Sequence, residues 1–147
     1  MADTEKRDLV SIEDLSTDEI LELFHHADQF RDNLRAWSDI CRGSIMATLF
    51  FEPSTRTRLS FESAMLRLGG GVITAADEKN TSRSKGESLA DTVRVVGGSY
   101  ADILVVRHPE DGAARVAARY ARVPVINGGD GAHEHPTQTL CDLYTLW

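Results

Sequence analysis

Hydroxyl and guanidinium side chains are concentrated where an apolar segment of the chain ends and a segment with helical spacing begins. Ser54, Thr55, Arg56 and Thr57 follow the nearly continuous apolar run 44–51 and open a stretch with helical spacing. The first turn of a helix has N–H groups without intrahelical partners and a partial positive charge, so it suits a phosphate. One serine there would most simply cap the helix, but several hydroxyls beside a guanidinium add charge-assisted donors. Together the four residues predict a phosphate-binding turn.

Three further groups of polar residues each follow another apolar segment. They are residues 82–85, the pair Arg107–His108, and residues 135–138. Taken singly, Arg107 could be a surface ion-pair partner, His135 a residue that starts a helix, and Lys85 a solvated charge. In open α/β sheets, however, ligands bind beyond the carboxyl ends of the strands. Their shared position after predicted strands therefore indicates one site.

The elements that would position these groups alternate along the chain. Strands are expected over 44–51, 72–76, 103–106 and 123–127, and helices over 55–68 and 109–121, with a last helix that has Pro136 in its first turn. Strands separated by helices indicate βαβ units. The predicted fold is an α/β, three-layer domain with a central parallel sheet of about four strands flanked by helices.

Serines followed three residues later by an acid predict where two more helices begin. Ser16 with Glu19, and Ser84 with Glu87, have the spacing of a capping box. Cys141 is expected to be packed in the last helix. The run 128–131 lacks the spacing of a dinucleotide fingerprint and is interpreted as a turn that shapes the pocket.

Composition excludes several classes of function. The 147 residues make one domain, with 41% hydrophobic and 27% charged residues and a formal net charge of -7. An acidic chain is a poor candidate for binding nucleic acid or an anionic membrane. The polar N-terminus lacks the apolar core of a signal peptide, and two cysteines form no disulfide framework, so a cytoplasmic location is expected. No pattern predicts a metal site or an organic cofactor.

Four ordered motifs resemble those of the aspartate and ornithine carbamoyltransferases. The segment 50–62, which contains the hydroxyl-rich turn, resembles the signature of that family, and the resemblance continues at 84–92, 107–109 and 135–140. It covers nearly the whole chain from about Ser16. It implies that residues 1–147 are a carbamoyl-phosphate-binding domain and that the family's second domain, which binds the amino acid, is absent from this chain.

The resemblance also implies a role for each site residue. Ser54, Thr55, Arg56 and Thr57 match the phosphate-binding turn. Thr57, Arg107 and His135 match groups that hold the carbonyl oxygen of carbamoyl phosphate, and Arg107 also reaches the phosphate. Gln138 matches a group that recognises the carbamoyl amine. Lys85, with either Ser82 or Ser84 and preferably Ser82, matches a loop that enters the active site of a neighbouring subunit in a homotrimer.

The reaction implied is carbamoyl transfer from carbamoyl phosphate to L-aspartate, an early step of pyrimidine biosynthesis, which gives N-carbamoyl-L-aspartate and phosphate. The nearest alternative is an ornithine carbamoyltransferase. Glu52 stands where the ornithine enzymes tend to carry a lysine, and Lys85 where they tend to lack one, so both favour aspartate. A binding module without turnover is a second alternative, and a phosphosugar or nucleotide binder is disfavoured. A regulatory chain remains open as a partner.

Overall fold

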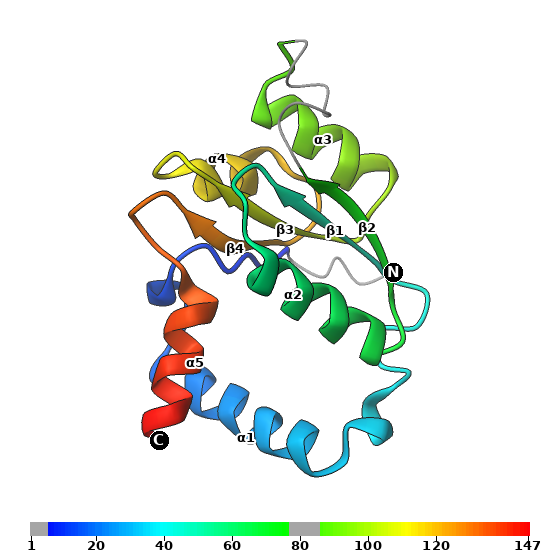
Figure 1. Cartoon of the computed structure of the whole chain (residues 1–147), viewed down its shortest axis with the longest axis vertical. Coiled ribbons are helices and arrows are strands. Elements are labelled where there is room, and N and C mark those ends of the chain that lie inside the picture. The colour runs from blue at the N-terminus through cyan, green and yellow to red at the C-terminus, as the bar shows by residue number, and fades with distance from the viewer. Residues whose placement is uncertain (1–5, 77–85) are drawn as a thin grey trace.

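Four parallel strands form the centre of the protein (Figure 1). The structure is a computed structural model that describes residues 6–76 and 86–147. The strands are β1 (Ile45–Phe50), β2 (Gly71–Ala76), β3 (Ile103–His108) and β4 (Val125–Asp130), in the spatial order β2-β1-β3-β4. With β1 and β3 in the middle, the polar residues that follow them lie at the centre of one sheet edge.

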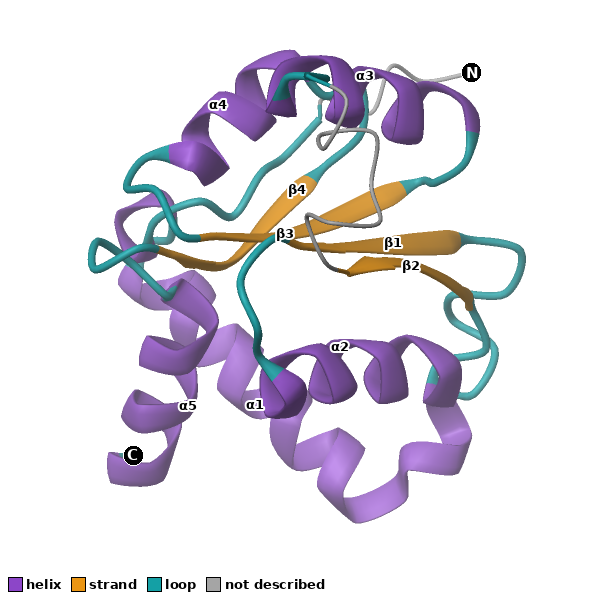
Figure 2. Cartoon of the chain, turned by 45° about the horizontal axis from the view of Figure 1, so that its top comes forward, coloured by secondary structure: helices purple, strands orange, loops and turns teal. Residues whose placement is uncertain are grey.

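Helices cover both faces of the sheet (Figure 2). The helices α3 (Leu89–Ser99) and α4 (Ala113–Tyr120) lie on one face; α1 (Thr17–Asn33), α2 (Thr55–Arg67) and α5 (Pro136–Leu146) lie on the other. The predicted three-layer α/β fold with about four parallel strands is therefore confirmed. No helix in the described part of the chain is long and apolar enough to cross a membrane.

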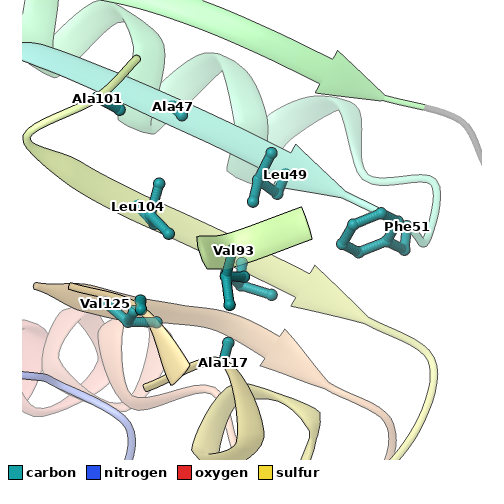
Figure 3. Close-up of a cluster of buried hydrophobic side chains, with 10 residues drawn as sticks. Ala47, Leu49, Phe51, Val93, Ala101, Leu104, Ala117 and Val125 are labelled. Carbon is teal, nitrogen blue, oxygen red and sulfur yellow. The ribbon is translucent and has the colours of Figure 1, made fainter. Parts of the chain in front are cut away.

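The strand residues alternate between two apolar clusters, as a sheet buried on both faces requires. Ala47 and Leu49 pack toward α3 and α4, where Leu104 and Val125 of the neighbouring strands join them (Figure 3). Met46 and Phe50 of β1 pack on the opposite face, together with Met65 of α2, Val105 of β3 and partly buried Phe61. The sheet is thereby fixed from both sides and forms a rigid base for the residues at its edge.

Two predicted helix starts are wrong. The helix α3 begins at Leu89, and its cap is Ser88, whose hydroxyl accepts from the Asp91 N–H at 3.1 Å, rather than Ser84. The helix α4 begins at Ala113 instead of Pro109, because the Glu110 N–H donates to His108 Nδ1 and Gly112 has a φ of 78°. Residues 109–112 therefore form a turn between β3 and α4.

The segment before α1 closes the outer edge of β4. Leu9 forms a parallel bridge with Ile126: its N–H donates to the Val125 carbonyl at 2.9 Å, and its carbonyl accepts from Asn127 at 2.8 Å. The capping box predicted from Ser16 and Glu19 is present at the start of α1. A covered edge strand cannot pair with another chain, and here the cover also restrains the loop after β4.

Candidate active site

A cavity of about 950 Å³ lies where α2 and α5 begin, beyond the carboxyl end of β3. Among the residues that the structure describes, its lining holds two arginines and no carboxylate, although the whole chain carries a net charge of -7. The lining residues are Pro53, Ser54, Thr55, Arg56, Thr57, Ser60, Phe61, Ala64, Arg107, His135, Thr137, Gln138 and Cys141. The described lining is therefore locally positive within an acidic protein, as the binding of an anion requires.

Seven of the nine predicted site residues line this one cavity. They come from three separate parts of the chain: Ser54 to Thr57, Arg107, and the pair His135 and Gln138. The other two, Ser82 and Lys85, lie outside the described residues, as does the alternative Ser84. The expected convergence after β1, β3 and β4 is present, although shared position does not by itself assign a role to any residue.

The N–H groups at the start of α2 are not capped by the side chain of Ser54. Ser54 occupies the N-cap position with extended backbone, yet its side chain makes no capping hydrogen bond. The serines at the same position of other helices behave differently: Ser16 and Ser88 both accept from a backbone N–H one turn ahead. The interpretation of Ser54 as a simple cap is therefore wrong. The free N–H groups of the first turn face a cavity that can hold an anion.

Arg56 brings an uncompensated positive charge to the same turn. Its side chain is exposed and lines the cavity, and no carboxylate within residues 6–76 or 86–147 forms an ion pair with it. A guanidinium presents five donors in a planar fork that matches two phosphate oxygens at once. Arg56 and the helix N-terminus therefore offer complementary donors to one oxyanion.

Arg107 is held at the end of β3 by two fixed acceptors. Its Nη1 donates to the Gly128 carbonyl at 2.9 Å, and its Nη2 lies 3.3 Å from the Glu52 carboxylate. Only 18% of the side chain is exposed, and its buried Nε has no hydrogen-bond partner among the described residues. An unpaired buried donor costs about 1–3 kcal/mol, a cost that the fold bears at this position.

A glycine bulge in β4 makes room for this arginine. Val106 pairs with Asn127 and His108 pairs with Asp130, so Gly128 and Gly129 both stand opposite Arg107. Strand bulges of this kind commonly re-aim a side chain next to a binding site. The predicted turn over 128–131 is wrong for Gly128 to Asp130, because these residues belong to β4, which ends three residues beyond the predicted strand end.

Two buried polar side chains fix the loop that follows the bulge. Asn127 Oδ1 accepts from the Gly129 N–H at 2.8 Å, and its Nδ2 donates to the Val10 carbonyl at 2.9 Å. The Asp130 carboxylate, 1% exposed, accepts from the N–H groups of Gly112 and Glu134. These bonds tie the bulge and the residue before His135 to the N-terminal segment and to the start of α4. Sequence patterns gave no role to either residue.

His135 caps α5 and thereby acquires a defined tautomer. Its Nδ1 accepts from the Gln138 N–H at 3.4 Å and lies 3.3 Å from the Thr137 hydroxyl. Because the Gln138 N–H can only donate, the proton of the neutral ring resides on Nε2. His135 can therefore act as a neutral hydrogen-bond donor in the cavity, with its ring held by the helix that follows.

Burial and the Arg107 guanidinium hold the pKa of His135 below the ordinary histidine value. Burial lowers it below 6.5, the nearby Arg107 guanidinium lowers it further, and a backbone hydrogen bond opposes these effects. Because the folded pKa is depressed, the contribution of His135 to stability is present above pH 6.5 and is lost as the pH falls through the folded pKa. A ¹³C NMR titration, assigned with His135→Gln, should give a midpoint below 6.5. A midpoint at or above that value would contradict the described environment.

Gln138 and Cys141 line the cavity from α5. Gln138 Nε2 donates to Asp142 at 2.9 Å, which leaves its amide oxygen to accept from a ligand N–H. Cys141 is exposed and lines the cavity, so its expected packing within the protein is wrong. The ring of Tyr144, one turn along, packs against Phe24 of α1 instead. In the described part of the chain, no group of three or more His, Cys, Asp or Glu residues could hold a metal ion.

The chain matches the family described as aspartate/ornithine carbamoyltransferase, carbamoyl-P binding domain, over residues 7–147. The match covers nearly the whole chain, so this protein belongs to that family. It is similar to the aspartate carbamoyltransferase catalytic subunit of Picrophilus torridus, with 60% identity over 140 residues that cover 94% of this chain and 46% of the relative.

Two solved structures share the fold. The catalytic subunit of Methanocaldococcus jannaschii aspartate transcarbamoylase superposes with a TM-score of 0.88 at 55% identity, covering 95% of this chain and 46% of that one. The Trypanosoma cruzi aspartate transcarbamoylase, solved in complex with carbamoyl phosphate and aspartate, has a TM-score of 0.87 at 42% identity, covering 96% and 47%. The chain thus spans less than half the length of these relatives.

Proposed function

We propose that this chain is the carbamoyl-phosphate half of an aspartate carbamoyltransferase, with residues 1–147 as its carbamoyl-phosphate-binding domain. The observation that carries the proposal is the cavity that joins the uncapped start of α2 with Arg56, Arg107 and His135. Family membership supports it, as does the Trypanosoma cruzi relative solved with carbamoyl phosphate and aspartate.

The phosphate group would lie at the start of α2. The N–H groups of the first turn, the hydroxyls of Ser54, Thr55 and Thr57, and the Arg56 guanidinium are donors without a competing carboxylate in the described lining. Such an arrangement favours the dianion in the ground state. It favours the departing phosphate still more, because negative charge on that group rises as its bond to carbon breaks.

The carbonyl oxygen of carbamoyl phosphate would face Arg107, His135 and Thr57. When an amine attacks the carbonyl carbon, a C–N bond forms and negative charge develops on that oxygen before the C–O bond to phosphate breaks. The proton of the amine leaves with the phosphate or to solvent, and no enzyme nucleophile is needed. A neutral His135 that donates through Nε2, beside a fixed guanidinium, stabilises this charge without reorganisation.

The carbamoyl amine would donate to Gln138. Its amide nitrogen is engaged by Asp142, so the oxygen is the free end of the group. An acceptor at this point distinguishes a carbamoyl group from an acetyl group of similar size, because a methyl group cannot donate and would leave the acceptor unpaired.

Aspartate is the preferred second substrate, ahead of ornithine. Glu52, whose identity favours aspartate in the sequence analysis, forms an ion pair with Arg107, and all three named relatives are aspartate enzymes. The intact enzyme would act in the cytoplasm in pyrimidine biosynthesis, as a homotrimer whose shared site receives Ser82 and Lys85 from a neighbouring subunit. A regulatory chain is an additional possible partner. In the intact enzyme, the amino acid would bind to the part that corresponds to the half of the relatives that this chain does not cover.

Calorimetry and a turnover assay on the same preparation test the proposal. This chain should bind carbamoyl phosphate, and inorganic phosphate more weakly, but should form little or no carbamoyl-aspartate, because it spans less than half the length of the aspartate enzymes it matches. An intact enzyme that contains this chain should carbamoylate aspartate in preference to ornithine. Failure of the chain to bind either phosphate compound would contradict the assignment, and preference for ornithine would overturn the choice of substrate.

A further inference from the structure

A carboxylate lies between α2 and the sheet, in a contact that is otherwise largely apolar. The Glu62 side chain is 19% exposed, and Oε1 accepts from the hydroxyls of Thr48 at 3.0 Å and Thr74 at 2.8 Å. These threonines are paired in register on β1 and β2, and their hydroxyl oxygens are 3.1 Å apart. One carboxylate oxygen of the helix is therefore held by both strands beneath it.

Arg58 extends this contact toward the start of the helix. Its Nε lies 3.7 Å from Glu62 Oε1, one helical turn away, and is buried without a hydrogen-bond partner among the described residues. A leucine-like side chain in place of Glu62 would avoid the desolvation of a carboxylate. Buried ion pairs replaced by well-packed apolar groups often leave stability unchanged or raised, so stability alone does not account for Glu62.

The apolar contacts of α2 leave its rotation poorly defined. Phe61 both lines the cavity and packs against the cluster around Met65, so a helix turned slightly about its axis would still bury apolar surface. The hydroxyl–carboxylate bonds are directional and act at one rotation and one height above the sheet. The cavity-lining side of the same helix carries Thr57 and Ser60.

We infer that Glu62 is a positioning residue that uses Thr48, Thr74 and Arg58 to set the rotation and height of α2, and hence the placement of the anion-binding turn 54–57. The inference rests on the proposed function, because it concerns the same phosphate site. Glu62 is not among the residues that line the cavity. It acts through the helix backbone, over the two turns that separate it from Ser54.

The test compares stability with affinity in a variant whose contact is fully apolar. In Glu62→Leu combined with Arg58→Met, Thr48→Val and Thr74→Val, the polar groups are removed together, so no unpaired hydroxyl, guanidinium or carboxylate remains between helix and strands, and the net charge is unchanged. The unfolding free energy should equal or exceed that of the unaltered chain. The dissociation constant for carbamoyl phosphate should rise roughly tenfold, since small displacements of binding groups weaken their interactions strongly.

Two more variants separate positioning from packing. Glu62→Gln keeps an acceptor oxygen for both threonines and should retain most of the affinity of the unaltered chain for carbamoyl phosphate. Ser63→Leu adds the same apolar side chain to an exposed neighbouring position of α2 and should leave affinity unchanged. Unaltered affinity in the apolar variant would overturn the inference, as would a loss that only follows the fraction of unfolded protein. An unaltered chain that binds no phosphate compound would instead refute the proposed function.

Discussion

Arg56→Ala should raise the dissociation constant for carbamoyl phosphate about a hundredfold or more and leave the fold intact. The guanidinium lines the cavity at the uncapped start of α2, and no carboxylate in the described residues competes for it. A charge-assisted bidentate contact to a dianion would therefore be lost without any compensating release of a protein partner. The unfolding free energy should change by less than about 0.5 kcal/mol, because the side chain is exposed.

Calorimetric titration with carbamoyl phosphate, paired with thermal unfolding, measures both effects. Arg67→Ala is the matched control, since Arg67 is an exposed arginine in the last turn of the same helix and outside the cavity. Its removal alters the net charge equally but should leave affinity nearly unchanged. Equal affinities in the Arg56 variant and the unaltered chain would show that the phosphate does not bind at this turn.

The parts of the site that sequence reasoning found share a local signal. Ser54 to Thr57 and Arg107 directly follow predicted strands, and His135 follows one after the segment 128–134. Parallel strands place such residues at one sheet edge. The fold class followed from the same alternation of apolar strands with helical spacing. These inferences needed only neighbours along the chain, and each of these residues does line the cavity.

Helix starts were harder to predict because two signals overlap. Ser84 with Glu87 and Ser88 with Asp91 have the same spacing, four residues apart, and the structure has Ser88 as the cap of α3. No local rule distinguishes two consecutive capping patterns. The choice depends on how the helix packs against the sheet. With Ser88 as the cap, Val93 is fully buried in the core.

The residues that hold the site in place could not be predicted from the sequence, for a different reason. Glu52 is paired with Arg107 across 55 positions, and Asn127 reaches the carbonyl of Val10 across 117 positions. Glycines in 128–131 suggested a turn, whereas Gly128 and Gly129 form a strand bulge opposite Arg107. Contacts of this kind arise from the tertiary arrangement, so their meaning appears once the strands are paired.

The second large loss of stability and affinity is expected for Gly129→Ala, in the bulge of β4. Gly129 has a φ of 116°, a conformation that is essentially restricted to glycine. A β-carbon there would overlap Arg107 Nη1 and lie 3.4 Å from His135 Cδ2. The substitution must therefore displace either the guanidinium from the Gly128 carbonyl or the loop from Asn127. We expect a loss of about 3 kcal/mol in unfolding free energy and at least tenfold weaker carbamoyl-phosphate binding.

Gly43→Ala separates backbone strain from the collision. Gly43 also has a positive φ, of 84°, but a β-carbon there would meet no heavy atom within 4 Å, and it lies before β1, at the end of the strand opposite the cavity. It should cost about 1–2 kcal/mol and leave affinity unchanged. Arg107→Ala combined with Gly129→Ala should be destabilised by less than the sum of the single changes, because the first removes the atom that the new methyl group meets. Additive losses in denaturant unfolding would mean that the glycine is needed for its backbone angle alone and not to seat the arginine.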